Sequence, residues 1–192
     1  TGGAGFIGFN YVRELLVLEP QCEVIVLDKL TYAGNPRSLA ELSGERRLRF
    51  VHGDIADRAV VRPLLAELRP QAVVHFAAES HVDRSLLDPD VFVRTNCSGT
   101  NVMCDLAVQI GVERFLHIST DEVYGSIEEG SFSETDLLAP RSPYSAAKAG
   151  SDLIALAYHE THELPLVLTR SSNQFGPYQF PEKLIPLIIQ KA

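Results

Sequence analysis

The amino-acid sequence predicts an α/β fold in which a doubly wound parallel sheet carries helices on both faces. Short runs rich in Val and Ile alternate with longer stretches of helical period, which is the pattern of repeated βα units. A glycine loop, Gly2-x-x-Gly5-x-x-Gly8, stands directly before one of these helical stretches. With 192 residues, 45% of them hydrophobic and 22% charged, the chain can bury one substantial core.

Strands and helices are expected in alternation along the chain. Continuous apolar runs predict strands over 22–28, 48–54, 72–77, 114–119 and 166–170, as expected for strands covered on both faces. Helical spacing predicts helices over 7–18, 57–68, 90–110 and 144–162. Pro89 and Gly111 bound the third helix, and Pro165 follows the fourth. Residues 130–143 are polar and contain proline, so we expect a loop there.

Composition argues against several classes of protein. A net charge of −8 disfavours a nucleic-acid ligand, because such binders gather Lys and Arg on one face. No apolar run has the length of a membrane span, and no signal peptide is recognised. Three cysteines form no C-x-x-C pair, and His159 and His162 lack a third ligand. We therefore expect a cytoplasmic protein with no metal site.

Both ends of the chain suggest a fragment. A glycine loop of this kind follows a strand, yet Thr1 is the first residue, and residues 182–192 end within an unfinished amphipathic segment. We therefore expect a fold truncated at both ends. Residues 1–175 would form a dinucleotide-binding domain with the catalytic residues, and residues 176–192 would begin a substrate-binding region whose remainder is absent.

The glycine loop predicts a dinucleotide site. Gly2, Gly5 and Gly8 allow a tight turn and the approach of a pyrophosphate to a helix amino end. Asp28 lies 20 residues beyond Gly8 at a strand end, where a carboxylate can accept hydrogen bonds from ribose hydroxyls and repel a 2′-phosphate. This favours NAD over NADP, although Lys29 weakens the exclusion. Asp28 could alternatively form only a turn, and Asp54 could contact adenine or cap the next helix.

Tyr144 and Lys148 are the predicted catalytic pair. They lie one helical turn apart, on one face of the expected helix. A tyrosine with a pKa of about 10 is a poor base at neutral pH, but a nearby cation lowers this pKa. We expect Lys148 to act in this way while it binds the nicotinamide ribose. The alternative is a half-buried tyrosine beside a solvated lysine, which is common on helices.

Two carboxylates follow Ser119-Thr120 at a predicted strand end. Asp121 and Glu122 could supply the acid and the base that the removal of water requires. A regular strand would direct them to opposite faces, so they serve one site only if the chain bends after Thr120. The alternative is that Thr120 and Asp121 only cap a short helical turn.

These motifs together resemble the extended short-chain dehydrogenase/reductase family, and within it the nucleotide-sugar 4,6-dehydratases. The resemblance covers essentially the whole chain, in TGGAGFIG at 1–8, LDKLTYAGN at 27–35, FAAESHVDRS at 76–85, STDEVYG at 119–125, SPYSAAKAGSD at 142–152 and GPYQFPEKLIPL at 176–187. It implies a Rossmann-type NAD-binding domain. The implied cofactor-binding residues, besides the glycines, Tyr144 and Lys148, are Phe6, Ile7, Asp28, Lys29, Leu30, Thr31, Asp54, Ile55, Phe76, Ala77, Ala78, Glu79, Ser80 and Thr95.

The resemblance also implies a substrate and a division of labour. The substrate would be a nucleoside-diphosphate glucose, with dTDP-glucose favoured, held by Ser80, Thr120, Asn173, Lys183 and Leu184. Tyr144 would remove the proton of the 4-hydroxyl while hydride leaves carbon 4 for NAD. Glu122 would then remove the carbon 5 hydrogen, Asp121 would protonate the departing 6-hydroxyl, and hydride would return to carbon 6.

Two alternative functions remain open, and the resemblance also implies an oligomeric state. A 4-epimerase of the same family shares the glycine loop and the Tyr-x-x-x-Lys pair but has no need of Asp121 and Glu122. A fragment that binds NAD without turnover is the other alternative. The resemblance further implies a homodimer through a bundle that includes the Tyr144 helix, whose small residues Ala146, Ala147, Ala149 and Gly150 would permit close packing.

Overall fold

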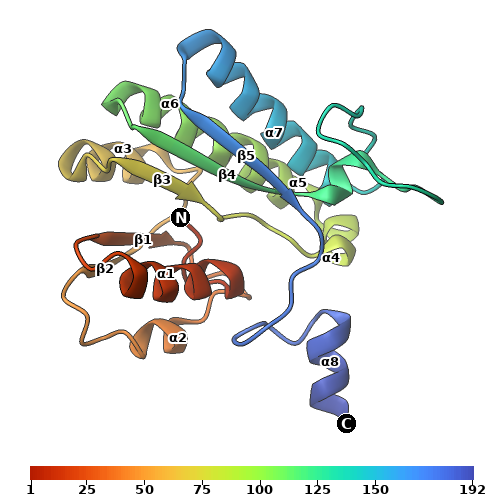
Figure 1. Ribbon diagram of the computed structural model, residues 1–192, viewed down its shortest axis with the longest axis horizontal. Coiled ribbons are helices and arrows are strands. Elements are labelled where there is room, and N and C mark those ends of the chain that lie inside the picture. Colours follow the sequence, from red (N-terminus) through yellow and green to blue (C-terminus); the bar gives the residue numbers. More distant parts are fainter. The chain divides into compact units, whose positions relative to one another are not determined.

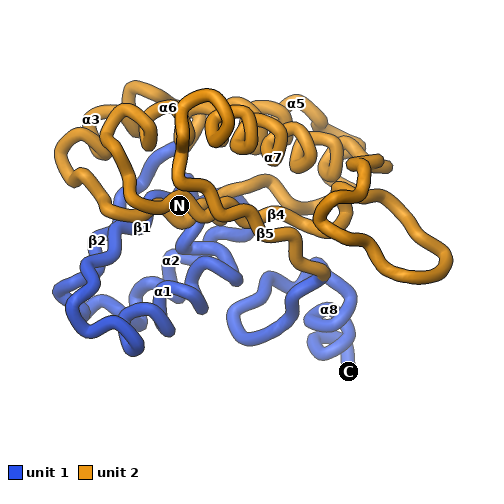
Figure 2. Tube along the Cα trace, turned by 45° about the horizontal axis from the view of Figure 1, so that its top comes forward, with its two compact units in different colours: residues 1–54, 173–192 blue, residues 55–172 orange.

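The computed structural model describes residues 1–192 and divides into two compact units. Residues 1–54 and 173–192 form the first unit, and residues 55–172 form the second (Figure 2). Each unit holds its own set of parallel strands. Residues 173–192 therefore pack with the amino-terminal unit, and the domain boundary after residue 175 stays a prediction. None of the helices combines the length with the hydropathy that a membrane-spanning segment needs.

The first unit contains two strands. Its elements are α1 (Phe6–Leu18), β1 (Val24–Asp28), α2 (Pro36–Ala40), β2 (Leu48–His52) and α8 (Leu184–Lys191). Strand β1 pairs in parallel with β2, from Val24 opposite Leu48 to Asp28 opposite His52. Val12 and Leu16 of α1 are buried against Val26 of β1, and this cluster fixes the helix on the strand that ends at Asp28.

The second unit contains a three-stranded parallel sheet in the order β3-β4-β5. Its elements are α3 (Arg58–Leu68), β3 (Ala72–His75), α4 (Val82–Leu87), α5 (Pro89–Phe92), the π-helix η1 (Val93–Gly99), α6 (Thr100–Ile110), β4 (Arg114–Thr120), the 3-10 helix η2 (Asp121–Tyr124), α7 (Pro143–His162) and β5 (Leu166–Ser171). Helices α3, α6 and α7 lie side by side over one face of this sheet (Figure 1). Phe115 and Met103 are among the fully buried side chains between these layers.

The predicted strands and long helices are all present within a few residues of their expected bounds. The helix expected over 90–110 is interrupted, because it passes through the π-helix η1 before α6 begins. A Cβ at Gly99, the last residue of η1, would lie 2.5 Å from Cδ1 of Ile55, so glycine permits this close approach. The short helices α2 and α4 were not predicted.

Candidate active site

The chain turns sharply after Thr120, where β4 gives way to η2. Thr120 caps the new helix, since its Oγ1 accepts from the Glu122 amide at 3.2 Å. The same hydroxyl donates to Oδ1 of Asp121 at 3.3 Å. Thr120 is thus a cap, and the bend also removes the strict alternation that would have separated the two carboxylates. We call residues 120–124 the acid–base turn.

Tyr144 lies against this turn at the start of α7. Ser142 and Ser145 form a capping box there, with Pro143 in the first turn, so the helix start is firmly defined. The Tyr144 side chain is buried and hydrogen-bonds the side chain of Thr120. Its ring meets Phe92 edge to face, with centroids 6.4 Å apart. The phenol is therefore fixed beside the acid–base turn.

The expected effect of Lys148 on Tyr144 is wrong for the chain as it stands. Burial and the negative charge of Glu122 raise the pKa of Tyr144 to about 12, while the hydrogen bond with Thr120 opposes them. The Lys148 ammonium instead donates to the carbonyl oxygen of Ile118 at 2.7 Å. Burial lowers the pKa of Lys148 to about 8, and the charge of Asp152 opposes this shift. Tyr144 is thus a protonated phenol facing two carboxylates.

Asp152 is a residue that sequence reasoning missed. It follows Lys148 by one helical turn and is fully buried, within 3.3 Å of Nε2 of His117 and 2.9 Å of Nε of Arg170. Burial lowers the pKa of His117, and the charges of Lys148 and Arg170 add to this, against the opposing effect of Asp152. The spacing Tyr144, Lys148, Asp152, with polar residues on one face of a helix rich in alanine, was an available signal.

The segment after β3 is held by another residue that was not predicted. Asn96 of η1 is buried, and its side chain accepts from the Glu79 amide at 2.9 Å and donates to the Glu79 carbonyl at 3.0 Å. These two bonds satisfy the backbone where the strand has ended. Thr95 is buried beside Asn96 in the sequence, whereas Ser80 is exposed. Glu79, Ser80 and Thr95, which are predicted cofactor residues, thus lie at or next to the backbone that Asn96 holds.

The first unit carries the glycine loop, and its geometry suits a phosphate ligand. Gly2 has φ +72°, and a Cβ at Gly8 would lie 2.3 Å from the Gly2 carbonyl oxygen. Only glycine therefore allows α1 to begin so close to the turn. No side chain caps the amino end of α1 and its first turn holds no acidic residue, so its amides remain suited to a diphosphate. The chain thus fits the dinucleotide that its sequence predicts.

Asp28 ends β1 and ties the loop together. One carboxylate oxygen accepts from the Ala4 amide at 2.9 Å, and the other accepts from the Leu30 amide at 2.8 Å. Leu30 follows with φ +55°, an uncommon backbone conformation for a leucine. Each oxygen keeps a second lone pair, so these bonds leave room for ribose hydroxyls. Lys29 pairs with Asp54 at 2.9 Å, and its charge is therefore not free for a 2′-phosphate.

The predicted substrate-binding residues fall in both units. Thr120 and Ser80 belong to the second unit, whereas Asn173, Lys183 and Leu184 belong to the first. Lys183 precedes α8 without a side-chain capping bond, and Leu184, the first residue of α8, is 72% exposed. Their assignment to a substrate stays a prediction.

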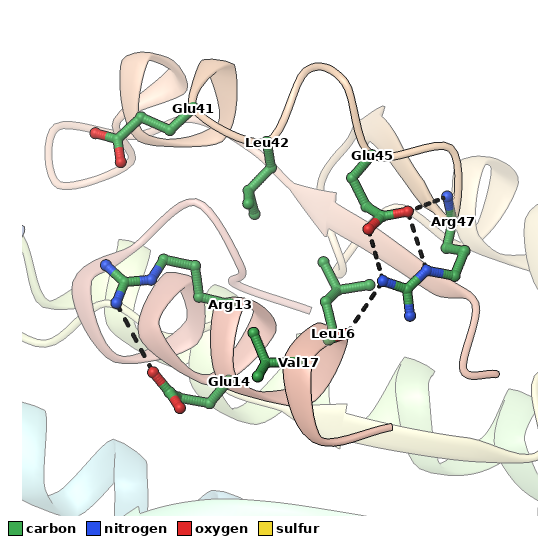
Figure 3. Close-up of a pocket in the computed structure, with 8 residues that line it drawn as sticks. All are labelled: Arg13, Glu14, Leu16, Val17, Glu41, Leu42, Glu45 and Arg47. Carbon is green, nitrogen blue, oxygen red and sulfur yellow. Dashed lines mark hydrogen bonds and ion pairs between the residues drawn. The ribbon is translucent and has the colours of Figure 1, made fainter. Parts of the chain in front are cut away.

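A pocket of about 400 Å³ in the first unit contains none of the predicted residues (Figure 3). Arg47 closes one side of it and pairs with Glu45 at 2.6 Å. The same guanidinium donates to the carbonyl oxygen of Leu16 at 3.1 Å, near the end of α1. The Arg47 guanidinium thus pairs a carbonyl oxygen in the last turn of α1, and this structural role accounts for the charged lining of the pocket.

Comparison with known proteins places this arrangement in a family. The chain belongs to the family described as GDP-mannose 4,6 dehydratase, whose model matches residues 1–192. A dTDP-glucose 4,6-dehydratase of an Actinoplanes species is 53% identical over 100% of this chain and 61% of its own length. The chain thus spans about three fifths of that relative.

Solved structures agree with the predicted fold. The structure of the Streptomyces venezuelae dTDP-glucose 4,6-dehydratase with NAD bound superposes with a TM-score of 0.95 at 55% identity, over 99% of this chain and 60% of that one. The Thermus thermophilus UDP-glucose 4-epimerase in complex with NAD gives a TM-score of 0.87 at 32% identity, over 98% and 59% of the two chains. The Rossmann-type α/β fold and the family resemblance are therefore confirmed.

Proposed function

We propose that this chain carries the NAD-binding and catalytic part of a nucleotide-sugar 4,6-dehydratase that converts dTDP-glucose to the 4-keto-6-deoxy sugar. The observation that carries the proposal is the cluster around Tyr144: its hydroxyl hydrogen-bonds Thr120 and lies within electrostatic reach of Glu122 and Asp121. A phenol, a hydroxyl and two carboxylates are the groups that oxidation followed by elimination requires. The relatives named dTDP-glucose 4,6-dehydratase support this choice of substrate.

The cofactor would be held by residues that fit it. The glycine loop and the amino end of α1 would bind the diphosphate, and Asp28 would bind the adenosine ribose. NAD supplies a reversible hydride acceptor, which takes hydride from carbon 4 and returns it to carbon 6. Lys29, engaged with Asp54, adds no free cation that would favour a 2′-phosphate.

The residues of the second unit would move the protons. Once ionised, Tyr144 would take the proton of the 4-hydroxyl, and Thr120 would bind the same sugar oxygen. The resulting ketone acidifies the hydrogen on carbon 5, which Glu122 would remove, while Asp121 would protonate the departing 6-hydroxyl so that it leaves as water. Glu122 would return a proton to carbon 5 when hydride adds to carbon 6. The high pKa of Tyr144 means that this proton transfer needs a closer cation than the one present, because Lys148 is engaged with Ile118. Lys148 would have to turn from that carbonyl toward the Tyr144 hydroxyl.

The test is to supply the complete natural protein with NAD and dTDP-glucose. We expect the absorbance that 4-keto sugars develop in alkali, together with a new C6 methyl signal in the proton NMR spectrum. UDP-glucose in a parallel reaction would report on the nucleotide base. Glu122→Gln and Asp121→Asn should abolish the methyl signal while Tyr144 still permits oxidation. A product without the methyl group would contradict the proposal.

A 4-epimerase is the second candidate, because the Thermus thermophilus enzyme shares the fold and 32% of the sequence. An epimerase returns hydride to carbon 4 and would yield a dTDP-galactose product without a methyl group. The acid–base turn discriminates: in an epimerase, removal of either carboxylate should leave the turnover nearly unchanged. Binding of NAD with no conversion of any sugar nucleotide would indicate the third reading, a cofactor-binding module.

We further propose a cytoplasmic homodimer assembled through α7. The small residues Ala147 and Ala149 are buried within the chain, so they cannot form the contact with a second copy. Leu153 is 58% exposed and Leu156 is 36% exposed, and Ala146 lies two turns before Leu153 on the same helix. Light scattering on the complete protein tests this, since a monomer would reject it.

A further inference from the structure

The second unit holds a buried chain of polar contacts that the proposed chemistry does not use. Asp152 accepts from Nε of Arg170 at 2.9 Å, and Nη1 of Arg170 donates to the hydroxyl oxygen of Tyr124 at 2.7 Å. The three residues come from α7, from β5 and from the last position of η2. They therefore connect the helix that carries Tyr144 and Lys148 to the turn that carries Asp121 and Glu122.

The geometry of each contact is specific. The guanidinium carbon of Arg170 lies 4.9 Å from the centroid of the Tyr124 ring, so the arginine contacts both the face and the hydroxyl of this tyrosine. Tyr124 also stacks on Phe132, with ring centroids 5.0 Å apart. The ring is thus held by packing, and its hydroxyl has one defined role as an acceptor for Arg170.

The contacts are buried and charged. Asp152 is 0% exposed, and the side chain of Arg170 is 12% exposed. Burial opposes ionisation of Asp152, but its polar contacts, among them the hydrogen bond from Arg170, lower its pKa, so the carboxylate is ionised at neutral pH. A buried ion pair stabilises a fold weakly compared with apolar packing, and its retention here suits a role in fixing geometry.

We propose that Asp152 and Arg170 are positioning residues, which hold the acid–base turn in register with Tyr144 through the hydroxyl of Tyr124. This inference rests on the proposed dehydratase reaction. The turn carries the two carboxylates that act only in the elimination, whereas Tyr144 acts in the oxidation. Loosening the Tyr124 end of the turn should therefore slow elimination more than oxidation.

The experiment is Tyr124→Phe in the complete protein, because this change removes only the hydroxyl and keeps the stacked ring. Tyr158→Phe is the matched control, since the Tyr158 hydroxyl donates to Oδ1 of Asn101 at 3.1 Å on the same unit, remote in sequence from the turn. Mixing with dTDP-glucose should give NADH absorbance at a rate within twofold of the parent for both variants. For Tyr124→Phe, formation of the 4-keto-6-deoxy product should fall at least tenfold, so that NADH accumulates.

A purely structural role predicts a different pattern, in which both steps slow equally or neither changes in Tyr124→Phe. Either result would overturn the proposal. Equal accumulation of NADH in Tyr158→Phe would also overturn it, because the Tyr158 hydroxyl takes no part in the contacts among Asp152, Arg170 and Tyr124. The partition between the two steps is thus the readout that loss of stability alone would not move.

A second measurement keeps the inference testable if the protein proves to be an epimerase. In urea unfolding, Tyr124→Phe should lower the midpoint concentration of the parent protein. In the Asp152→Asn background the same change should lower the midpoint by at most a third as much, because the Tyr124 hydroxyl acts through Arg170. Should Asp152→Asn fail to fold, Arg170→Lys replaces it, since lysine keeps the positive charge but cannot donate to Asp152 and Tyr124 with the planar geometry of the guanidinium. Equal shifts in both backgrounds would show that the Tyr124 hydroxyl and Asp152 are not coupled through Arg170, and would overturn the proposal. If the two substitutions are coupled in urea unfolding but no methyl product forms, only the proposed reaction is rejected, and the inference about Asp152 and Arg170 stands.

Discussion

Replacing Lys148 by methionine should stabilise the protein at neutral pH while it abolishes turnover. The lysine is buried, and burial lowers its pKa from 10.5 to about 8. That difference corresponds to about 3 kcal/mol of penalty for holding the charged form in the folded state. Methionine has a similar length and needs no such charge, but the Ile118 carbonyl then loses a donor, which costs about 1 kcal/mol. The expected net gain is about 2 kcal/mol.

The pH dependence identifies the cause of this gain. Because the folded-state pKa of Lys148 is depressed, the unfolded chain binds one more proton between pH 8 and 10.5, and the stability of the parent rises with pH across this window. The advantage of Lys148→Met should therefore be full below pH 8 and shrink as the pH rises toward 10.5. At pH 7 we expect a melting temperature higher by about 4–8 °C.

The assay is thermal unfolding at pH 7 and at pH 9.5, with conversion of dTDP-glucose measured on the same preparations. Lys191→Met is the control, because Lys191 is an exposed residue at the end of α8, and its substitution should change stability by less than about 0.5 kcal/mol. Turnover of Lys148→Met should fall at least about a hundredfold. A variant that is less stable than the parent at pH 7, or whose gain is the same at both pH values, would refute the reasoning.

Three further predictions follow from single contacts. Tyr144→Phe should lower the rate of NADH formation at least about a hundredfold, while the dissociation constant for NAD, measured by calorimetry, should stay within twofold of the parent. Asp28→Asn should weaken NAD binding at least about tenfold, because an amide cannot accept from both Ala4 and Leu30 as the carboxylate does; an unchanged affinity would contradict this role. Gly99→Ala should cost about 1–3 kcal/mol, since its Cβ would lie 2.5 Å from Ile55, and the penalty should disappear in an Ile55→Ala background when measured by urea unfolding.

Local patterns made most of the fold predictable. The runs that became β1 to β5 are apolar and β-branched, and the helices around Tyr144 and Val61 have clear apolar spacing, so short-range information was enough. Helices α2 and α4 are too short to show a period, and each depends on a local cap, from Asn35 and from His81. The π-helix η1 depends on contact with Ile55, which is 44 residues distant from Gly99 in sequence. Such tertiary causes leave no local signature.

The candidate site divides in the same way. The need for a bend after Thr120 follows from strand geometry, and the structure has one. The direction of the Tyr144 pKa shift was wrong because it depends on burial and on where Lys148 finds an acceptor, and both are decided by the packing of α7 on β4. Asn96 and Arg170 were not singled out, since their partners Glu79 and Asp152 are 17 and 18 residues away.

The second unit places buried charges where an apolar core would be more stable, and two substitutions separate the reasons for them. If Lys148 serves chemistry alone, its removal raises stability and ends turnover. If Asp152 and Arg170 serve geometry, loss of the Tyr124 hydroxyl lowers stability and slows one step selectively. A cluster retained only as structural packing would give losses of stability in both cases and no change in the partition of the reaction. Opposite signs for Lys148→Met and Tyr124→Phe are therefore the outcome that a functional origin of this cluster demands.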